Sequence, residues 1–438
     1  MPWRWRGYPH AGRWGAVVVL AVALLLTAAC GGGSETPSQA GGQGTGDSTG
    51  DGEPAGEAPA PPPAPAEPPV TLTVIGPWAG AEMEQFMPAL EAAEEALNLD
   101  IEYRIYRAED LQSVLPPQFA AQQAPGDVIF MWDWWIRENA QHAVDLSDVW
   151  QAESASYLLQ AAEADGRVVA VPYAMSVKPG FWYKKSFFEA HGLEPPADWD
   201  GFMALLEQIA AIDGITAPIA SGDGVGWPLS DVTEHFLIAF GGPDLQRGLI
   251  SGDVAWTDPE VRQIFTDRLV PALEYFGDPV EWTQGVELWW NEEYALYFMG
   301  NWITGMVENP DDLGVFPLPG TRGVVAGTDY AFVPAYSRNV DAARDLVAFL
   351  ISREGMLARA AQGGKLTGRT DIDASAYPPA DAALAQALAE VEETLPDLDD
   401  TVGGDWQATF WDQLKLLWVD PSAVDDVLEI LQEEREAQ

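Results

Sequence analysis

Short segments of alternating apolar and polar residues are interspersed along the chain with segments of helical periodicity. Val70 to Val74 alternate as a half-buried strand does, and Gly76 and Pro77 stop the pattern. Further strands are predicted at 101–105, 127–131 and 168–171, and helices at 83–97, 111–123, 199–209 and 341–350. Because strands and helices alternate in this way, the sequence predicts α/β layers with mostly parallel sheets.

Local chemistry predicts where some of these elements begin and end. Pro172 should end the strand at 168–171, because proline donates no backbone hydrogen bond to a sheet. Asp198 is the predicted N-cap of the helix that follows it. Ser422 and Asp425 form a start like a capping box for the last helix. The region from residue 70 to the end exceeds what one hydrophobic core usually holds, so we expect two lobes.

The first 29 residues have the pattern of a secretory signal peptide. Arg4, Arg6 and Arg13 precede an uncharged apolar run that is too short for a comfortable membrane span. The run ends in Leu-Leu-Leu-Thr-Ala-Ala-Cys, which resembles a bacterial lipobox with Cys30 as the lipidated residue. The alternative is ordinary secretion, with Cys30 removed or left free. A lipid on Cys30 would hold the protein to the extracytoplasmic face of a membrane.

Residues 30–69 are rich in Gly, Pro and Ala and contain no Lys, Arg or aromatic residue. Such a composition cannot bury enough apolar surface to order its backbone, so we expect a flexible tether between the lipid and the folded body.

The composition excludes several classes of function. The 438 residues include 68 Asp and Glu against 22 Lys and Arg, a net charge of −46, which argues against nucleic acid as a partner. One cysteine and four histidines leave little for a metal site, and we expect no metal or cofactor. The acidity fits a saline habitat or good solubility, and a cationic ligand such as a polyamine is the alternative.

Tryptophan is the most informative residue type. Three tryptophans surround Asp133 directly after a predicted buried strand: Trp132, Trp134 and Trp135. Trp78 also follows a strand, and ligands of open α/β sheets bind beyond the carboxyl ends of strands. A flat indole packs against the C–H face of a sugar while carboxylates bind its hydroxyls. The same rings also suit an organic cation.

Several segments, in order, resemble the extracellular solute-binding proteins of ABC importers, the sugar-binding family that includes maltose-binding protein. The similar segments are Val171-Pro172-Tyr173, 180–188, 195–202, Gly226-Trp227-Pro228-Leu229-Ser230-Asp231, Tyr294-Ala295-Leu296-Tyr297-Phe298-Met299-Gly300-Asn301-Trp302, 314–320 and 339–356. One departure is Asn291-Glu292-Glu293, where the family often has Gly-Lys.

The resemblance implies two hinge-linked α/β lobes with a ligand cleft between them. Lobe one would comprise 70–175 and 326–370, and lobe two 176–325 and 371–438. The ligand-binding residues that we expect from the resemblance and from the tryptophan pattern are Trp78, Glu82, Trp132, Asp133, Trp134, Tyr173, Trp227, Trp302, Asp329 and Trp411.

The resemblance also implies the function. We expect a monomeric, lipid-anchored protein that binds a sugar or oligosaccharide by lobe closure and delivers it to a membrane permease. A binder of an organic cation is the alternative. A secreted glycoside hydrolase would need two placed carboxylates, but carboxylates are too abundant here to be specific, and the common hydrolase and nucleotide motifs are missing from the sequence.

Overall fold

A computed structural model describes residues 68–222, 226–388 and 392–437. They belong to one compact unit, Ala66–Gln438. The predicted signal peptide, Cys30 and nearly all of the predicted tether lie outside the described residues. Within the described part, no helix is both long enough and apolar enough to cross a membrane.

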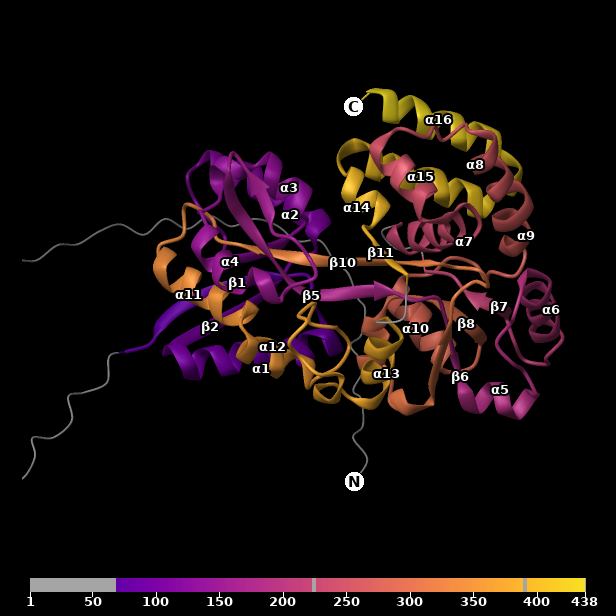
Figure 1. The fold of residues 1–438 in the computed structure, drawn as a ribbon, viewed down its shortest axis with the longest axis horizontal. Helices are drawn as coiled ribbons and strands as arrows, with labels where there is room; N and C mark the ends of the chain where they lie inside the picture. Colours follow the sequence, from indigo (N-terminus) through magenta and orange to yellow (C-terminus); the bar gives the residue numbers. More distant parts are fainter. Residues whose placement is uncertain (1–67, 223–225, 389–391, 438) are drawn as a thin grey trace, which may run out of the picture. The chain divides into compact units, whose positions relative to one another are not determined.

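The larger of two sheets has seven strands and belongs mainly to the N-terminal half of the unit (Figure 1). Its strands, in spatial order, are β2 (Leu99–Ile105), β1 (Val70–Gly76), β3 (Val128–Met131), β10 (Gly323–Phe332), β5 (Arg167–Lys178) and β4 (Ala162–Ala164), with β11 (Glu393–Leu395) pairing with β10.

The smaller sheet has four strands. They are, in order, β7 (Ala217–Ala220), β8 (Tyr294–Phe298), β6 (Phe181–Lys184) and β9 (Leu313–Phe316).

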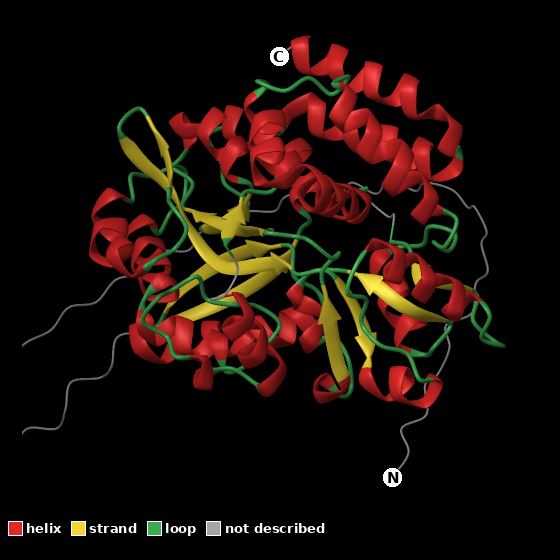
Figure 2. Ribbon diagram, turned by 45° about the vertical axis from the view of Figure 1, so that its right-hand side comes forward, coloured by secondary structure: helices red, strands yellow, loops and turns green. Residues whose placement is uncertain are grey.

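Helices cover the faces of both sheets (Figure 2). Those of the first half are α1 (Gly80–Leu97), α2 (Ala108–Ala120), α3 (Asp133–Glu138) and α4 (Ser147–Glu153). The middle of the chain forms α5 (Lys185–His191), α6 (Trp199–Ala210), α7 (Trp227–Ser251), α8 (Pro259–Ile264), α9 (Val270–Leu273) and α10 (Trp282–Trp290). The last are α11 (Val340–Ile351), α12 (Arg353–Ala360), α13 (Pro379–Leu388), α14 (Leu398–Val402), α15 (Gly404–Val419) and α16 (Val424–Ala437).

The central strands of the larger sheet are buried on both faces, because side chains alternate along a strand and helices pack on each side. Val74 and Phe130 pack with α1 and α11 on one face. Ile75 and Ile129 pack with α2 and α3 on the other. This two-sided burial explains why the strand segments are so apolar, and it confirms the predicted α/β class.

The two long strands β5 and β10 lie side by side along the region where the two sheets approach each other (Figure 1). Pro172 was expected to end β5, but the strand continues to Lys178. The register of the β5–β10 ladder shifts between Thr328 and Tyr330, and Pro172 lies at this irregularity. A bulge tolerates a residue that has no N–H to donate, so the expectation for Pro172 was wrong.

The sheets are mixed, so the prediction of mostly parallel pairing was also wrong. β1 pairs parallel with β2 and β3, but β10 runs antiparallel to β3 and β5. β4 and β5 form a hairpin whose turn residues, Asp165 and Gly166, both have positive φ. Antiparallel strands arise here because β10 returns to the larger sheet from the smaller one, against the direction of its neighbours.

Of the two predicted helix caps, one is confirmed and the other is wrong. The Asp198 carboxylate accepts a hydrogen bond from the Gly201 backbone N–H at 2.8 Å, which confirms it as the N-cap of α6. The expectation for Ser422 was wrong, because Asp420 takes the capping position and accepts from both the backbone N–H and the hydroxyl of Ser422. α16 then begins at Val424.

Candidate functional site

A cavity of about 290 Å³ lies between residues that follow strands of the larger sheet and helices that cover the smaller one. One wall is formed by the ends of β1 and β3, the start of α1 and the middle of β10. The opposite wall comes from α7, α10, the start of α14 and α15. Six tryptophans line it: Trp78, Trp132, Trp227, Trp282, Trp302 and Trp411.

Most of the predicted ligand-binding residues line this cavity. They are Trp78, Glu82, Trp132, Trp227, Trp302, Asp329 and Trp411. Trp78 and Trp132, which directly follow strands, thus lie at the edge of the sheet that faces the cavity.

Three of the predicted residues are not part of the cavity wall. The Tyr173 side chain is only 1% exposed and packs among Trp78, Phe86 and Phe130. Trp134 stacks on Trp132, with ring centroids 5.8 Å apart, and Asp133 forms an ion pair with Arg137. Tyr173 and Trp134 thus pack against tryptophans that line the cavity, and a direct ligand contact for any of the three stays a prediction.

The aromatic rings meet across the cavity. The Trp132 and Trp411 ring centroids, on opposite walls, are 6.4 Å apart. Trp227 lies 5.6 Å from both Trp282 and Trp302 in edge-to-face arrangements. An apolar ligand face that enters the cavity would therefore meet indole rings from both sides.

Local hydrogen bonds fix the segment that carries Trp302. The Asn301 side-chain oxygen accepts from the Val177 backbone N–H at 2.8 Å. The Trp182 indole N–H donates to the Met299 carbonyl at 2.7 Å. These bonds hold the segment after β8 against β5 and β6, and Trp302 within it is only 7% exposed.

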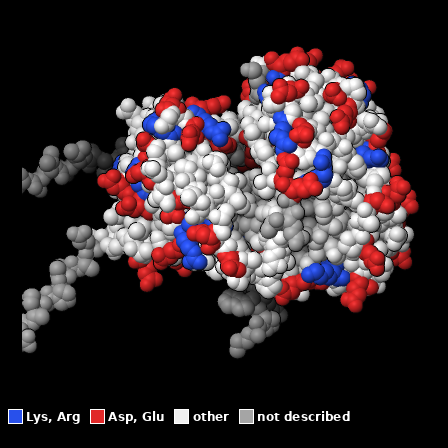
Figure 3. All heavy atoms as spheres, viewed as in Figure 1, with Lys and Arg blue, Asp and Glu red and all other residues white. Residues whose placement is uncertain are grey.

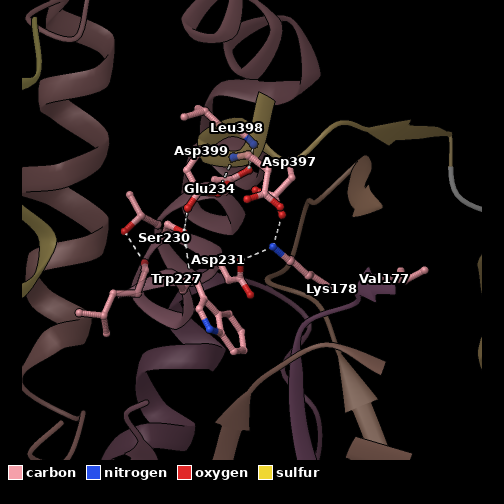
Figure 4. A network of polar contacts seen from close by, with 12 residues as sticks. Val177, Lys178, Trp227, Ser230, Asp231, Glu234, Asp397, Leu398 and Asp399 are labelled. Carbon is pink, nitrogen blue, oxygen red and sulfur yellow. Dashed lines mark hydrogen bonds and ion pairs between the residues drawn. The ribbon is translucent and has the colours of Figure 1, made fainter. Parts of the chain in front are cut away.

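A buried ion-pair network lies beside the cavity (Figure 4). The Lys178 ammonium, at the end of β5, binds the carboxylates of Asp231 and Asp397. Glu234 lies one helical turn after Asp231 and accepts hydrogen bonds from the Leu398 backbone N–H at 2.8 Å and from Gln246 at 2.6 Å. The network ties β5, α7 and the start of α14 together.

The charges in this network shift the pKa values of its members. Burial disfavours a charged Lys178, but the carboxylates of Asp231 and Asp397 hold its pKa well above the usual value. Burial also raises the pKa of Asp231 to about 7, against the opposing effect of Lys178. The pKa of Glu234 rises through burial and the nearby Asp397 charge. Burial acts on Asp397 too, but the Lys178 charge and the hydrogen bonds from Asp399, Lys178 and Glu234 together lower the Asp397 pKa to about 2.

The other two carboxylates on this wall also have partners within the protein. Asp399 accepts hydrogen bonds from the Ser230 hydroxyl at 2.8 Å and from the Trp411 indole N–H. Asp400 accepts from the Gln407 amide at 2.8 Å. The bond to Asp399 fixes the orientation of the Trp411 indole, which lines the cavity.

The same network is where a metal ion would be sought. Carboxylate oxygens of Asp231, Glu234 and Asp397 lie within 4.8 Å of one another, and all three residues are buried. The Lys178 ammonium already binds two of them, so it takes the place that a bound cation would have between Asp231 and Asp397 (Figure 4).

The sequence analysis did not identify several residues of the site. Trp282, Lys178 and Lys365 line the cavity, as do Asp397 and Asp399. Lysine is rare in this chain, with five residues in all, and its rarity is the one signal that could have singled out Lys178 and Lys365.

With its two α/β lobes and a tryptophan-lined cavity between them, the fold is that of a binding protein. The family of bacterial extracellular solute-binding proteins matches residues 76–357, and the chain belongs to this family. It is therefore an extracellular solute-binding component of an ABC transporter.

Individual relatives agree with this assignment. An uncharacterized ABC transporter extracellular-binding protein of Pyrococcus horikoshii is 51% identical over 370 residues, which is 83% of this chain and 88% of that protein. The bacterial solute receptor AcbH, described as having an exclusive preference for β-D-galactopyranose, has a similar structure, with a TM-score of 0.77 at 19% identity over 85% of this chain and 99% of that one. Maltose-bound MalE3 of T. maritima gives a TM-score of 0.70 at 19% identity, over 84% and 99% of the two chains. The two structures confirm the predicted fold.

The raised pKa of Asp231 predicts how stability depends on pH. A carboxyl group whose pKa is higher in the folded state than its usual value of about 4 stabilises the fold while it is protonated. That contribution is lost as the pH rises from about 4 to about 7. We expect the free energy of unfolding to fall over this range by about 1–3 kcal/mol because of the buried carboxyl cluster.

Urea unfolding at pH 4.5, 5.5, 6.5 and 7.5 measures this slope. Asp231→Asn should flatten it, whereas the control Asp213→Asn, in an exposed loop, should leave it unchanged. If the stability of the unaltered protein rose steadily with pH over this range, the raised pKa of Asp231 would be contradicted.

Proposed function

We propose that this protein binds a sugar or oligosaccharide outside the cell membrane and delivers it to the permease of an ABC importer. The observation that carries the proposal is the cavity lined by six tryptophans, with Glu82, Asp329 and Lys365 beside them. Indole faces suit the C–H faces of sugar rings, and charged groups bind hydroxyls. The sugar ligands of AcbH and MalE3, which share the fold, support the same class of ligand.

Lobe closure is the proposed mode of binding. We place lobe one at 70–175 and 326–370 and lobe two at 176–325 and 371–438, so that two of the boundaries fall within the paired strands β5 and β10. An Arg107 guanidinium nitrogen, just before α2, lies 3.7 Å from a carboxylate oxygen of Glu281, just before α10. A ligand that contacts both walls favours the closed state, because it makes its full set of contacts only there.

The remaining features of the proposal concern location and assembly. A monomer with a lipid on Cys30 and a tether up to residue 69 would stay close to the permease, which raises its effective concentration there. Acidic side chains are spread over the visible face of the body without forming one patch, which fits a role in solubility (Figure 3). The proposed work is binding without catalysis.

A thermal-shift screen tests the proposed ligand class. The purified protein is heated with D-galactose, maltose, trehalose, chitobiose or spermidine. A saccharide at 100 times its Kd stabilises the folded state by about 2.7 kcal/mol and should raise the midpoint by a few degrees. A shift with spermidine and with no saccharide would replace the proposal by the organic-cation alternative. Turnover of aryl glycosides by the same sample would contradict binding without catalysis.

Replacing Trp132 tests the aromatic walls. Trp132 is half-buried, so Trp132→Ala removes a ligand contact at a moderate cost in packing. We expect the Kd for the saccharide found in the screen to rise about 10- to 30-fold by calorimetry. Trp290→Ala is the matched control, because Trp290 is half-buried but lies outside the cavity wall. Equal affinities in both variants would remove Trp132 from the site.

Replacing Cys30 tests the lipid anchor. Cys30→Ser removes the thiol that would carry the lipid, and each buried CH₂ group contributes about 0.8 kcal/mol to membrane binding. We expect the variant to move from the membrane fraction to the soluble fraction of the producing cells or their medium. Ser34→Ala should remain with the membrane. Continued membrane association of the Cys30 variant would refute the anchor.

A further inference from the structure

Lys365 is a buried cation in the cavity wall with unused hydrogen-bonding capacity. Lys365 follows α12 and lines the cavity, and the residue is only 7% exposed. Its ammonium donates to the Ser176 hydroxyl at 2.6 Å and lies 5.0 Å from the centre of the Trp302 ring. An ammonium has three donors. Among the described residues, Lys365 has no carboxylate within 4.0 Å, so donors remain for a ligand.

Two carboxylates of the same wall face this ammonium. The charges of Asp329 and Glu82 both act on Lys365 and favour its protonated form, against the burial that lowers its pKa. Glu82 stands in the first turn of α1, and Asp329 lies at the irregularity of β10. In the described structure, no side chain donates a hydrogen bond to either carboxylate. One donor group and two acceptor groups therefore face the cavity together.

The carboxylates on the opposite wall differ in this respect. Asp397 binds Lys178, Asp399 binds Ser230 and Trp411, and Asp400 binds Gln407. Each of these three carboxylates thus has at least one partner within the protein, although one oxygen of Asp397 has none. At the other wall a cationic ligand would meet the Lys365 ammonium beside the two open carboxylates, and repulsion between the two positive charges disfavours such a ligand there.

We propose that Lys365 is a ligand-binding residue that determines specificity: its ammonium donates to a ligand oxygen while Glu82 and Asp329 accept from neighbouring hydroxyls. This set matches adjacent hydroxyl groups of an uncharged sugar, and it disfavours a polyamine. The inference rests on the proposed function and names the polar group that selects its ligand.

The contact between Lys365 and Trp302 also changes the role of Trp302. Trp302 was expected to stack on the sugar, but the Lys365 ammonium lies over its ring. The ring is also packed edge-to-face with Trp227 and is almost fully buried. In this arrangement Trp302 positions Lys365 through a cation–π contact, and the half-buried Trp132, Trp227 and Trp282 remain as rings that can stack.

Calorimetric titration with the saccharide found by thermal shift tests the inference. Lys365→Met should raise the Kd about 10- to 100-fold, since a charge-assisted hydrogen bond is lost. Lys365→Gln, which keeps a neutral donor, should lie between this variant and the unaltered protein. Lys415→Met is the matched control, because Lys415 is a partly exposed lysine that does not line the cavity. Unfolding midpoints of all variants without ligand separate loss of binding from loss of structure.

Deoxy analogues of the same saccharide identify the contact directly. The analogue that lacks the hydroxyl bound by Lys365 should bind the unaltered protein weakly and should lose little further affinity in Lys365→Met. The inference would be overturned if every deoxy analogue lost the same affinity for the unaltered protein and for Lys365→Met. It would also be overturned if Lys365→Met bound the saccharide with full affinity. If no saccharide binds the unaltered protein, the proposed function fails instead. Spermidine should bind neither the unaltered protein nor Lys415→Met, and tight binding of spermidine to either would also overturn the inference.

Discussion

The arrangement of the site depends on the buried ion pairs that the Lys178 ammonium forms. Lys178 lies at the end of β5 and binds Asp231 and Asp397, which are 53 and 219 residues away in the sequence. Removing one partner of a buried ion pair leaves an uncompensated charge and typically costs about 3–5 kcal/mol. This one group therefore fixes β5, α7 and the start of α14 relative to one another. Because β5 also pairs with β10, the same contact sets the position of both walls of the cavity.

The network also separates the acidity of the chain from the chemistry of its cavity. A net charge of −46 leaves a cationic ligand open as an alternative when only the composition is considered. In the folded protein, Lys178 binds Asp397, and Ser230 and Trp411 bind Asp399, on the wall formed by α7, α14 and α15. On the other wall the Lys365 ammonium lines the cavity together with Glu82 and Asp329, so that a ligand meets a donor and acceptors in one place.

The sequence could predict the parts of the site that depend on local pattern. Trp78 and Trp132 follow directly after strands. In open α/β sheets, ligands generally bind at the edge where the parallel strands end. Tyr173 lay within a recognisable segment, but its side chain turns into the core, a direction that the local alternation around Pro172 obscured. The rarity of lysine could have drawn attention to Lys178 and Lys365, but their roles could not be predicted, since these come from partners distant in sequence.

Trp78 illustrates why aromatic residues at a binding cavity resist simple assignment. Its ring lines the cavity but also packs on Phe86, Phe130 and Tyr173, with centroid distances of 4.6, 4.7 and 5.7 Å. The core of the larger sheet therefore extends without interruption into the ligand site. A substitution at Trp78 would change stability and affinity together. The half-buried rings, which contribute less to the core, are the positions where ligand stacking can be measured by itself, and this is why Trp132 is the more decisive residue to replace.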